Sequence, residues 1–263
     1  MKIKFLGTGS GKTSLNRHHS SFLISSSNHN LLVDCGDGIS NAILKQDISF
    51  SFIDSILISH FHADHFSGLP SLLTQMKLLS RKNDLKIFVH RSEKDFLEDF
   101  IFHSYLFIDR MTFDLKIISF DEDVKVKLDG SFSFKSKLNS HLDKYQRASL
   151  ETSPLQENKL GFVSLSFLFK DEENSVIYSG DVESENDLYL FNQKADWFIT
   201  ETTHIKKENI LDLLDKFDPS KIILTHIGDD FEKPLYDFHK SLPESLKSRI
   251  ILVFDGFELN QYS

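Results

Sequence analysis

Residues 60–65 read His-Phe-His-Ala-Asp-His, which places three imidazoles and a carboxylate within six residues, directly after an apolar stretch that predicts a β-strand. Imidazole binds Zn²⁺, Mn²⁺ and Fe²⁺, and carboxylate suits the harder of these ions. Side chains alternate along an extended chain, so His60 and His62 can point toward one ion. Asp64 and His65 then reach a second centre nearby. The alternative interpretation is a polar loop that happens to be rich in histidine.

Four further candidate ligands stand at or shortly after apolar stretches that predict strands: Asp34, His141, Asp181 and His226. A single histidine after a strand is usually a loop residue. The same arrangement of strand followed by ligand recurs at five places in this chain, counting residues 60–65. Because strand ends can present side chains to a common cleft, the pattern predicts one shared site.

The composition sets limits on fold and function. The chain has 263 residues, of which 40% are hydrophobic and 25 are phenylalanine, enough for a sizeable core, and we predict one domain over residues 1–263. The formal charge of −9 argues against general affinity for a nucleic-acid backbone, although it leaves room for a local basic groove. The single cysteine, Cys35, allows no intramolecular disulfide and is compatible with a reducing compartment. With no apolar run approaching 18 residues, we expect a soluble, cytoplasmic protein that does not enter membranes.

Hydrophobic periodicity predicts two blocks of strands, each accompanied by helices. This order favours an α/β fold in which two mixed β-sheets pack face to face with helices on the outside. We interpret the polar segment 143–159 as a loop that could act as a lid. The predicted helices are 39–46, 69–79, 93–107, 210–217 and 234–242. The predicted strands are 2–6, 20–25, 30–34, 54–58, 86–90, 114–120, 124–128, 131–138, 162–169, 175–178, 197–200, 221–224 and 250–254.

Taken together, these motifs resemble those of the metallo-β-lactamase superfamily. The resemblance rests on Asp34, residues 60–65, His141, Asp181 and His226, and it covers nearly the whole chain. The segments 5–10, 32–38, 58–70 and 224–226 make the chain look like the ribonuclease Z-like, phosphodiesterase branch. The resemblance implies an αββα sandwich, the metallo-β-lactamase fold, with a two-metal site at one edge.

The resemblance also implies seven ligands for two divalent ions, Zn²⁺ first and Mn²⁺ or Fe²⁺ as alternatives. The first metal would be bound by His60, His62 and His141. The second would be bound by Asp64, His65 and His226, with Asp181 bridging both. In this superfamily Asp34 orients the histidine loop through hydrogen bonds, and the alternative is a turn residue in a glycine-rich bend.

Two residues are candidates for catalysis. Two divalent ions about 3.5–4 Å apart can share a hydroxide, lower its pKa towards neutrality and polarise a phosphoryl or carbonyl oxygen. Asp64 could accept the proton of the bridging water. His204 lies 22 residues before His226, and in ribonuclease Z-like enzymes a histidine at comparable spacing protonates the leaving group. The alternative for His204 is an exposed residue near the start of a helix.

The sequence departs from ribonuclease Z in two ways that bear on substrate. That enzyme grips tRNA with a long arm between its third and fourth ligand motifs, whereas residues 162–181 predict two strands and a short turn. Thr200 stands where the branch carries the histidine of a His-Glu-Ala-Thr segment. We therefore expect a metal-dependent phosphodiesterase for a small or cyclic phosphodiester, with nucleic acid disfavoured.

Three other functions stay open at this stage. One is a ribonuclease Z-like tRNA 3′ endonuclease, which would bind its substrate through a partner subunit. Another is a lactone or thioester hydrolase on the same fold, because these reactions also use a metal-bound hydroxide. The third is a non-catalytic sensor, against which the intact ligand set argues. The resemblance also implies a homodimer, which is the usual assembly in the family.

Overall fold

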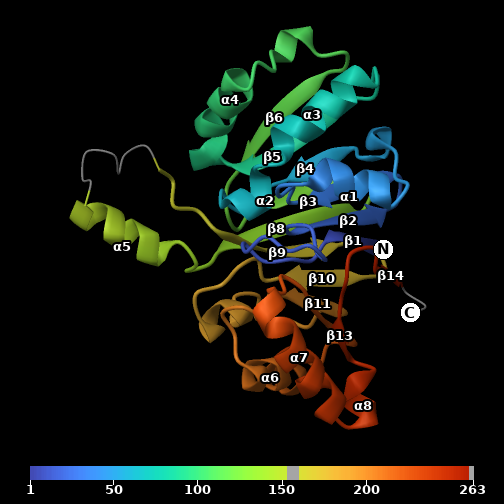
Figure 1. Ribbon diagram of the computed structural model, residues 1–263, viewed down its shortest axis with the longest axis vertical. Coiled ribbons are helices and arrows are strands. Elements are labelled where there is room, and N and C mark those ends of the chain that lie inside the picture. Colours follow the sequence, from blue (N-terminus) through green and yellow to red (C-terminus); the bar gives the residue numbers. More distant parts are fainter. Residues whose placement is uncertain (153–159, 261–263) are drawn as a thin grey trace.

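The computed structural model describes residues 1–152 and 160–260, which form two β-sheets packed face to face between layers of helices (Figure 1). The first sheet has the order β14-β1-β2-β3-β4-β5-β6. Its strands β1, β2 and β3 are antiparallel, and β3 to β6 run parallel. Its strands are β1 (Lys2–Gly7), β2 (Ser21–Ser26), β3 (His29–Val33), β4 (Ser55–Leu57), β5 (Leu85–His90), β6 (Leu115–Phe120) and β14 (Glu258–Asn260).

The second sheet has the order β13-β12-β11-β10-β9-β8-β7. It is also mixed, with β7 to β10 antiparallel and β10 to β13 parallel. The predicted α/β sandwich of two mixed sheets is therefore confirmed. The strands of this sheet are β7 (Lys125–Asp129), β8 (Phe132–Leu138), β9 (Leu165–Lys170), β10 (Ser175–Tyr178), β11 (Trp197–Thr200), β12 (Lys221–Leu224) and β13 (Ile250–Leu252).

Helices cover the outer faces of both sheets (Figure 1). The first sheet carries α1 (Ile39–Lys45), α2 (Ala63–Phe66), α3 (Leu69–Leu78) and α4 (Lys94–His103), and the second carries α6 (Lys207–Phe217), α7 (Asp229–Ser241) and α8 (Glu244–Lys247). These helices cover the sheets because each buries one apolar face. In α3 the residues of that face recur at helical spacing and are all buried: Leu69, Leu72, Leu73 and Met76. None of the helices in the described ranges combines the length and apolarity needed to cross a membrane.

The inner faces of the two sheets share a core rich in phenylalanine. Phe22 of the first sheet meets Tyr178 of the second edge to face, with ring centroids 5.0 Å apart. Phe88 and Phe134 make a similar contact at 5.7 Å. Burying one such ring contributes roughly 1.5–3 kcal/mol. This shared core fixes the two sheets relative to each other, and so positions loops at the strand ends of both.

The structure corrects several predicted boundaries. Residues 143–152, predicted as part of a loop, form α5 (Asp143–Thr152), and residues 153–159 lie outside the described ranges. Good helix formers such as lysine, glutamine and arginine stabilise this helix without an apolar stripe, so periodicity misses it. The helix predicted at 93–107 ends at His103, and α7 begins at Asp229, five residues before the predicted start at Pro234. The short, polar strand β14 was not predicted.

Candidate metal centre

The seven predicted ligands converge on the edge where strands of both sheets end. The segment 60–65 follows β4, and Asp34 follows β3 in the same sheet. His141, Asp181 and His226 follow β8, β10 and β12 of the other sheet. The structure places the seven residues in two groups. Within each group, the ligand atoms all lie within 4.8 Å of one another. The first group is His60, His62 and His141, and the second is Asp64, His65, Asp181 and His226.

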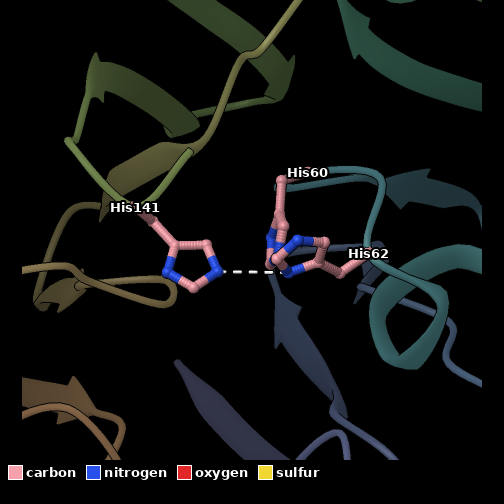
Figure 2. A group of neighbouring side chains, drawn as sticks. All are labelled: His60, His62 and His141. Atoms are coloured by element: carbon pink, nitrogen blue, oxygen red, sulfur yellow. Dashed lines mark hydrogen bonds between the residues drawn. The ribbon is translucent and has the colours of Figure 1, made fainter. Parts of the chain in front are cut away.

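The first group consists of three imidazoles that face one another (Figure 2). The ring of His60 lies 4.8 Å from that of His62 and 5.1 Å from that of His141, centroid to centroid. Nε2 of His141 is 3.1 Å from Nδ1 of His62. Burial lowers the pKa of all three rings, that of His62 to about 4. The group therefore offers neutral imidazoles, the form that binds a cation.

The second group combines two carboxylates with two imidazoles. Nε2 of His226 is 3.2 Å from Oδ2 of Asp64 and 3.2 Å from Oδ2 of Asp181. Burial would raise the pKa of both carboxyl groups, but the neighbouring imidazoles lower it below the ordinary value. Oδ2 of Asp181 also lies 3.4 Å from Nε2 of His65 and 3.9 Å from Nε2 of His141. Asp181 thus stands between the two groups.

Hydrogen bonds at Nδ1 direct Nε2 of four of these histidines into the site. The Nδ1–H of His60 donates to Ser59 Oγ at 3.1 Å, and the Nδ1–H of His65 donates to Asp34 Oδ2 at 2.8 Å. Nδ1 of His141 faces the carbonyl oxygen of Val182 at 3.4 Å, and Nδ1 of His226 faces Thr203 Oγ1 at 3.2 Å. Such partners fix the tautomer and the ring orientation of a metal ligand.

Asp34 lies behind the ligands and organises the histidine loop. The side chain is fully buried, and it accepts hydrogen bonds from Ser59 N at 2.7 Å and Ser59 Oγ at 2.8 Å. The hydroxyl of Tyr178, which the sequence did not indicate, donates to Oδ2 at 3.3 Å from the opposite sheet. Asp34 therefore contacts the loop and His65 and takes no position among the two ligand groups.

The backbone at the site adopts conformations that most residues avoid. Asp34 and His226 have φ values of 58° and 54°, in the left-handed region, and Gly180, just before Asp181, has a φ of 63°. Strained backbone of this kind is concentrated at functional sites, where surrounding contacts hold it. A Cβ on Gly36 would lie 2.0 Å from the carbonyl oxygen of Asp64. Only glycine allows this close approach between the loop that carries Asp34 and the loop that carries the ligands of residues 60–65.

The donor set fits a divalent metal ion. Nε2 of His60, Nε2 of His65 and Oδ1 of Asp181 are buried and have no hydrogen-bond partner within the described part of the chain. An unsatisfied buried polar atom costs about 1–3 kcal/mol, and a cation among these atoms removes that cost. Imidazole nitrogens and carboxylate oxygens are also the ligands that Zn²⁺ and similar ions prefer.

His204 lies at the mouth of the site and is paired with a buried glutamate. Nδ1 of His204 is 2.7 Å from Oε1 of Glu201, and 30% of the His204 side chain is exposed. The backbone N–H groups of Thr203 and His204 also donate to Glu201. The hydrogen bond and charge of Glu201 raise the pKa of His204, although burial opposes this. Glu201 had no predicted role, although its place directly after β11 repeats the pattern of a strand followed by a candidate ligand.

A cleft of about 280 Å³ opens in front of the two groups. Its walls come from the loop after β1, the start of α5, the loop after β11 and the start of α7. Apart from the predicted site residues His62, Asp64, His141, Asp181, His204 and His226, the residues that line the cleft were not predicted, because no spacing rule identifies them. The cleft is lined by Ser10, Gly11, Lys12, His62, Asp64, His141, Lys144, Tyr145, Asp181, Thr203, His204, His226, Gly228, Asp230 and Phe231.

Comparisons with known proteins agree with this architecture. A curated ribonuclease Z from Picrophilus torridus is 28% identical over 230 residues, which are 77% of this chain and 73% of the relative. Ribonuclease Z from Methanosarcina mazei is 38% identical over 100 residues, and that match spans only 33% of its length. Together with the ligand groups, these relatives support a metal-dependent hydrolase that is ribonuclease Z-like.

Solved structures show the same fold. The metallo-β-lactamase fold protein YhfI from Bacillus subtilis superposes with a TM-score of 0.73 at 20% identity, covering 98% of each chain. The short form of human tRNase Z superposes with a TM-score of 0.71 at 20% identity, covering 99% of each chain. These superpositions confirm the predicted metallo-β-lactamase fold. The family model described as Anti-Pycsar protein Apyc1 matches residues 1–241, and the chain belongs to that family.

Proposed function

We propose that the protein is a phosphodiesterase that hydrolyses a small or cyclic phosphodiester with two divalent metal ions, Zn²⁺ first among them. One group, His60, His62 and His141, would hold the first ion. Asp64, His65 and His226 would hold the second, and Asp181 would bridge them. The observation that carries this proposal is the pair of ligand groups joined by Asp181 at the base of the cleft.

Chemistry at such a site divides between the metals and the protein. A pair of divalent ions supplies a nucleophile at neutral pH and polarises the phosphoryl oxygen. Asp64 lines the cleft beside His226, and in this proposal it would accept a proton there. His204 holds a proton more readily than an ordinary histidine because Glu201 accepts from its Nδ1. With Nδ1 engaged, Nε2 is the atom left to give a proton to the leaving group.

The cleft favours a small substrate over a polyanionic strand. Both lysines that line it are already paired, Lys12 with Asp230 at 2.6 Å and Lys144 with Glu183 at 2.8 Å. Strands β9 and β10 are joined by only four residues, as predicted, so the tRNA-gripping arm has no counterpart there. A long nucleic acid requires many uncompensated basic contacts to its phosphates.

Two rival substrates remain for this site. The similarity to ribonuclease Z favours a tRNA 3′ endonuclease as the second candidate. A lactone or thioester hydrolase would need the same ligands and a substrate with a carbonyl in place of the phosphoryl group.

We also infer that residues 1–263 act as one domain, because the proposed ligands come from both sheets. The homodimer remains a prediction, which a measurement of the molecular mass in solution would test.

A panel of substrates tests the proposed function. Zn²⁺-loaded and Mn²⁺-loaded protein would be assayed with bis-p-nitrophenyl phosphate, a 3′,5′-cyclic nucleotide, a lactone, a thioester and a precursor tRNA. We expect hydrolysis of one or both small phosphodiesters and weak binding of the tRNA at physiological salt. Efficient cleavage of the precursor tRNA at its 3′ trailer would establish the second candidate, and turnover of the lactone or thioester alone would establish the third.

A further inference from the structure

A serine directly precedes two of the three histidines in the first ligand group, and a buried carboxylate holds each serine. In the first sheet, Asp34 accepts from the backbone N–H and the hydroxyl of the serine before His60. In the second sheet, Asp187 accepts from the backbone N–H of Ser140 at 3.1 Å and from its hydroxyl at 2.7 Å, and Ser140 directly precedes His141. The two sheets therefore present these histidines through the same arrangement of carboxylate, serine and imidazole.

Asp187 also binds the loop that follows β10. It is 6% exposed and lies in the first turn of the short helix η5 (Glu185–Tyr189). Its Oδ2 accepts from the backbone N–H groups of Glu183 at 3.0 Å and Ser184 at 3.4 Å. An acidic residue at the start of a helical turn ordinarily makes such local bonds. They do not account for the two bonds to Ser140, which lies 47 positions away in the loop after β8.

Two further contacts join the same two loops. Nδ1 of His141 faces the carbonyl oxygen of Val182, and Lys144 forms an ion pair with Glu183 at 2.8 Å. Both members of that ion pair are partly exposed, and exposed pairs contribute little to stability. The carboxylate of Asp187 is buried and receives four donors from the two loops, so it is the main link between them.

The linked loops carry His141 and Asp181, which belong to different ligand groups. Figure 2 shows His141 reaching towards His60 and His62 from its own loop, and its Nε2 lies 3.9 Å from Oδ2 of Asp181. Metal–ligand distances vary by only about 0.2 Å, so a small shift of one loop would take a ligand out of reach.

We infer that Asp187 is a positioning residue that fixes His141 and Asp181 relative to each other, so that the metal ions meet ligands already in place. This inference rests on the proposed function, because that proposal supplies the two ions. Asp187 touches neither ligand side chain through its carboxylate and acts through Ser140 and the loop after β10. It does for the second sheet what Asp34 does for the first.

Zn²⁺ binding, measured without turnover, tests the inference. Asp187→Ala leaves all seven proposed ligands in place. We expect its Kd for Zn²⁺, from competition with a chromophoric chelator, to rise by about 10- to 100-fold, the usual effect of losing a residue that supports metal ligands. Ser140→Ala removes one of the four bonds and should raise the Kd by about 2- to 10-fold. The double variant should lose less than the product of the two factors, because both changes break the same link.

Asp196 provides a matched control at the opposite edge of the second sheet. It accepts from the backbone N–H of Ser175 at 2.7 Å and from its hydroxyl at 2.8 Å, the same pair of donors, where β10 begins. Asp196→Ala should keep the native Kd for Zn²⁺ and the native absorption spectrum of the Co²⁺-loaded protein. Asp187→Ala should change both, whereas a residue that serves only folding would change neither in the folded protein.

The outcomes separate the inference from the proposed function. A native-like Kd and Co²⁺ spectrum in folded Asp187→Ala, or equal losses in Asp187→Ala and Asp196→Ala, would overturn the inference alone. Should Asp187→Ala not fold, an unchanged Kd in Ser140→Ala would overturn it. Metal binding that depends on Asp187 in a protein that hydrolyses no phosphodiester would overturn the proposed function alone. Native protein that binds neither Zn²⁺ nor Co²⁺ would overturn both.

Discussion

Nδ1 of His65 donates a 2.8 Å hydrogen bond to Oδ2 of Asp34, and both side chains are fully buried. The same carboxylate holds the backbone and the hydroxyl of Ser59, which in turn receives Nδ1–H of His60. One residue that takes no place among the ligands therefore sets the orientation of a histidine in each group. The geometry of the metal centre is built into the protein through these bonds.

Replacing Asp34 should weaken metal binding. Asp34→Ala removes the acceptor for His65 and Ser59, and loss of such a partner typically costs 10- to 100-fold in metal affinity. We expect a rise in the Zn²⁺ dissociation constant of about that factor, measured by competition with a chromophoric chelator. Asp37→Asn, an exposed change three residues away, is the matched control and should leave the constant unaltered. Native-like affinity in Asp34→Ala would show that the ligand loops hold their geometry without this residue.

His204 should affect substrates according to their leaving groups. His204→Ala is expected to slow hydrolysis of methyl phenyl phosphate by about 10²- to 10⁴-fold, the usual contribution of general acid catalysis. Methyl p-nitrophenyl phosphate needs little protonation and should lose far less. Glu201→Gln should show the same pattern in weaker form, because it removes the negative charge that helps to raise the pKa of His204. Equal losses on both esters, or loss of metal from His204→Ala, would assign His204 to binding or structure.

Asp255 should make stability depend on pH on the acidic side. Burial would raise its pKa, but hydrogen bonds from His18 and Thr8 outweigh burial and lower it below the ordinary 3.8. A lowered folded-state pKa stabilises the protein above the unfolded-state value, and this contribution disappears as the pH falls through the folded-state value.

Asp255→Asn removes that contribution. We expect the free energy of unfolding at pH 7 to fall by about 1.5–3 kcal/mol, the usual contribution of a hydrogen bond to a charged group. The difference from the native protein should shrink as the pH approaches 3, as followed by urea unfolding. Asp237→Asn, which removes an exposed partner of Lys233, should follow the native curve throughout. A constant difference from pH 7 to pH 3 would exclude ionised Asp255 as the source.

Metal removal should lower the melting temperature. A ligand that binds only the folded state at 100 times its Kd stabilises it by about 2.7 kcal/mol, which corresponds to roughly 5–10 °C for a chain of this size. We expect that shift when a chelator strips the metal, and its reversal on adding Zn²⁺. His141→Ala should melt at nearly the same temperature with and without chelator. Identical melting curves for native protein before and after verified metal loss would separate the site from folding stability.

The sequence predicted the architecture where hydrophobic pattern decides it. The alternation of apolar and polar residues in the sequence identified strands such as β8, and helical spacing identified α3. The polar helix α5 and the three-residue strand β14 escaped, because tertiary context rather than an apolar pattern holds them. The predicted ligands lie together because their motif follows strand ends, which are the positions that a fold brings to one edge.

Residues that lie behind the ligands or line the cleft were harder to predict, because their contacts depend on the folded structure. Tyr178 reaches Asp34 across the sandwich from another sheet, 144 positions along the chain. Tyr145 and Phe231 meet at one cleft only because two helices begin there. No local spacing encodes such contacts. Glu201 could have been found, since it directly follows a strand and stands three residues before His204.

Metal titration of activity tests the central claim most directly. Protein stripped of metal would be titrated with Zn²⁺ or Mn²⁺ while the hydrolysis of bis-p-nitrophenyl phosphate and the bound metal are measured on the same samples. We predict that activity rises until close to two ions are bound per chain, and that Asp181→Ala lowers both the number of ions and the rate. Protein that binds no transition metal, or whose phosphodiester hydrolysis does not respond to it, would contradict the account.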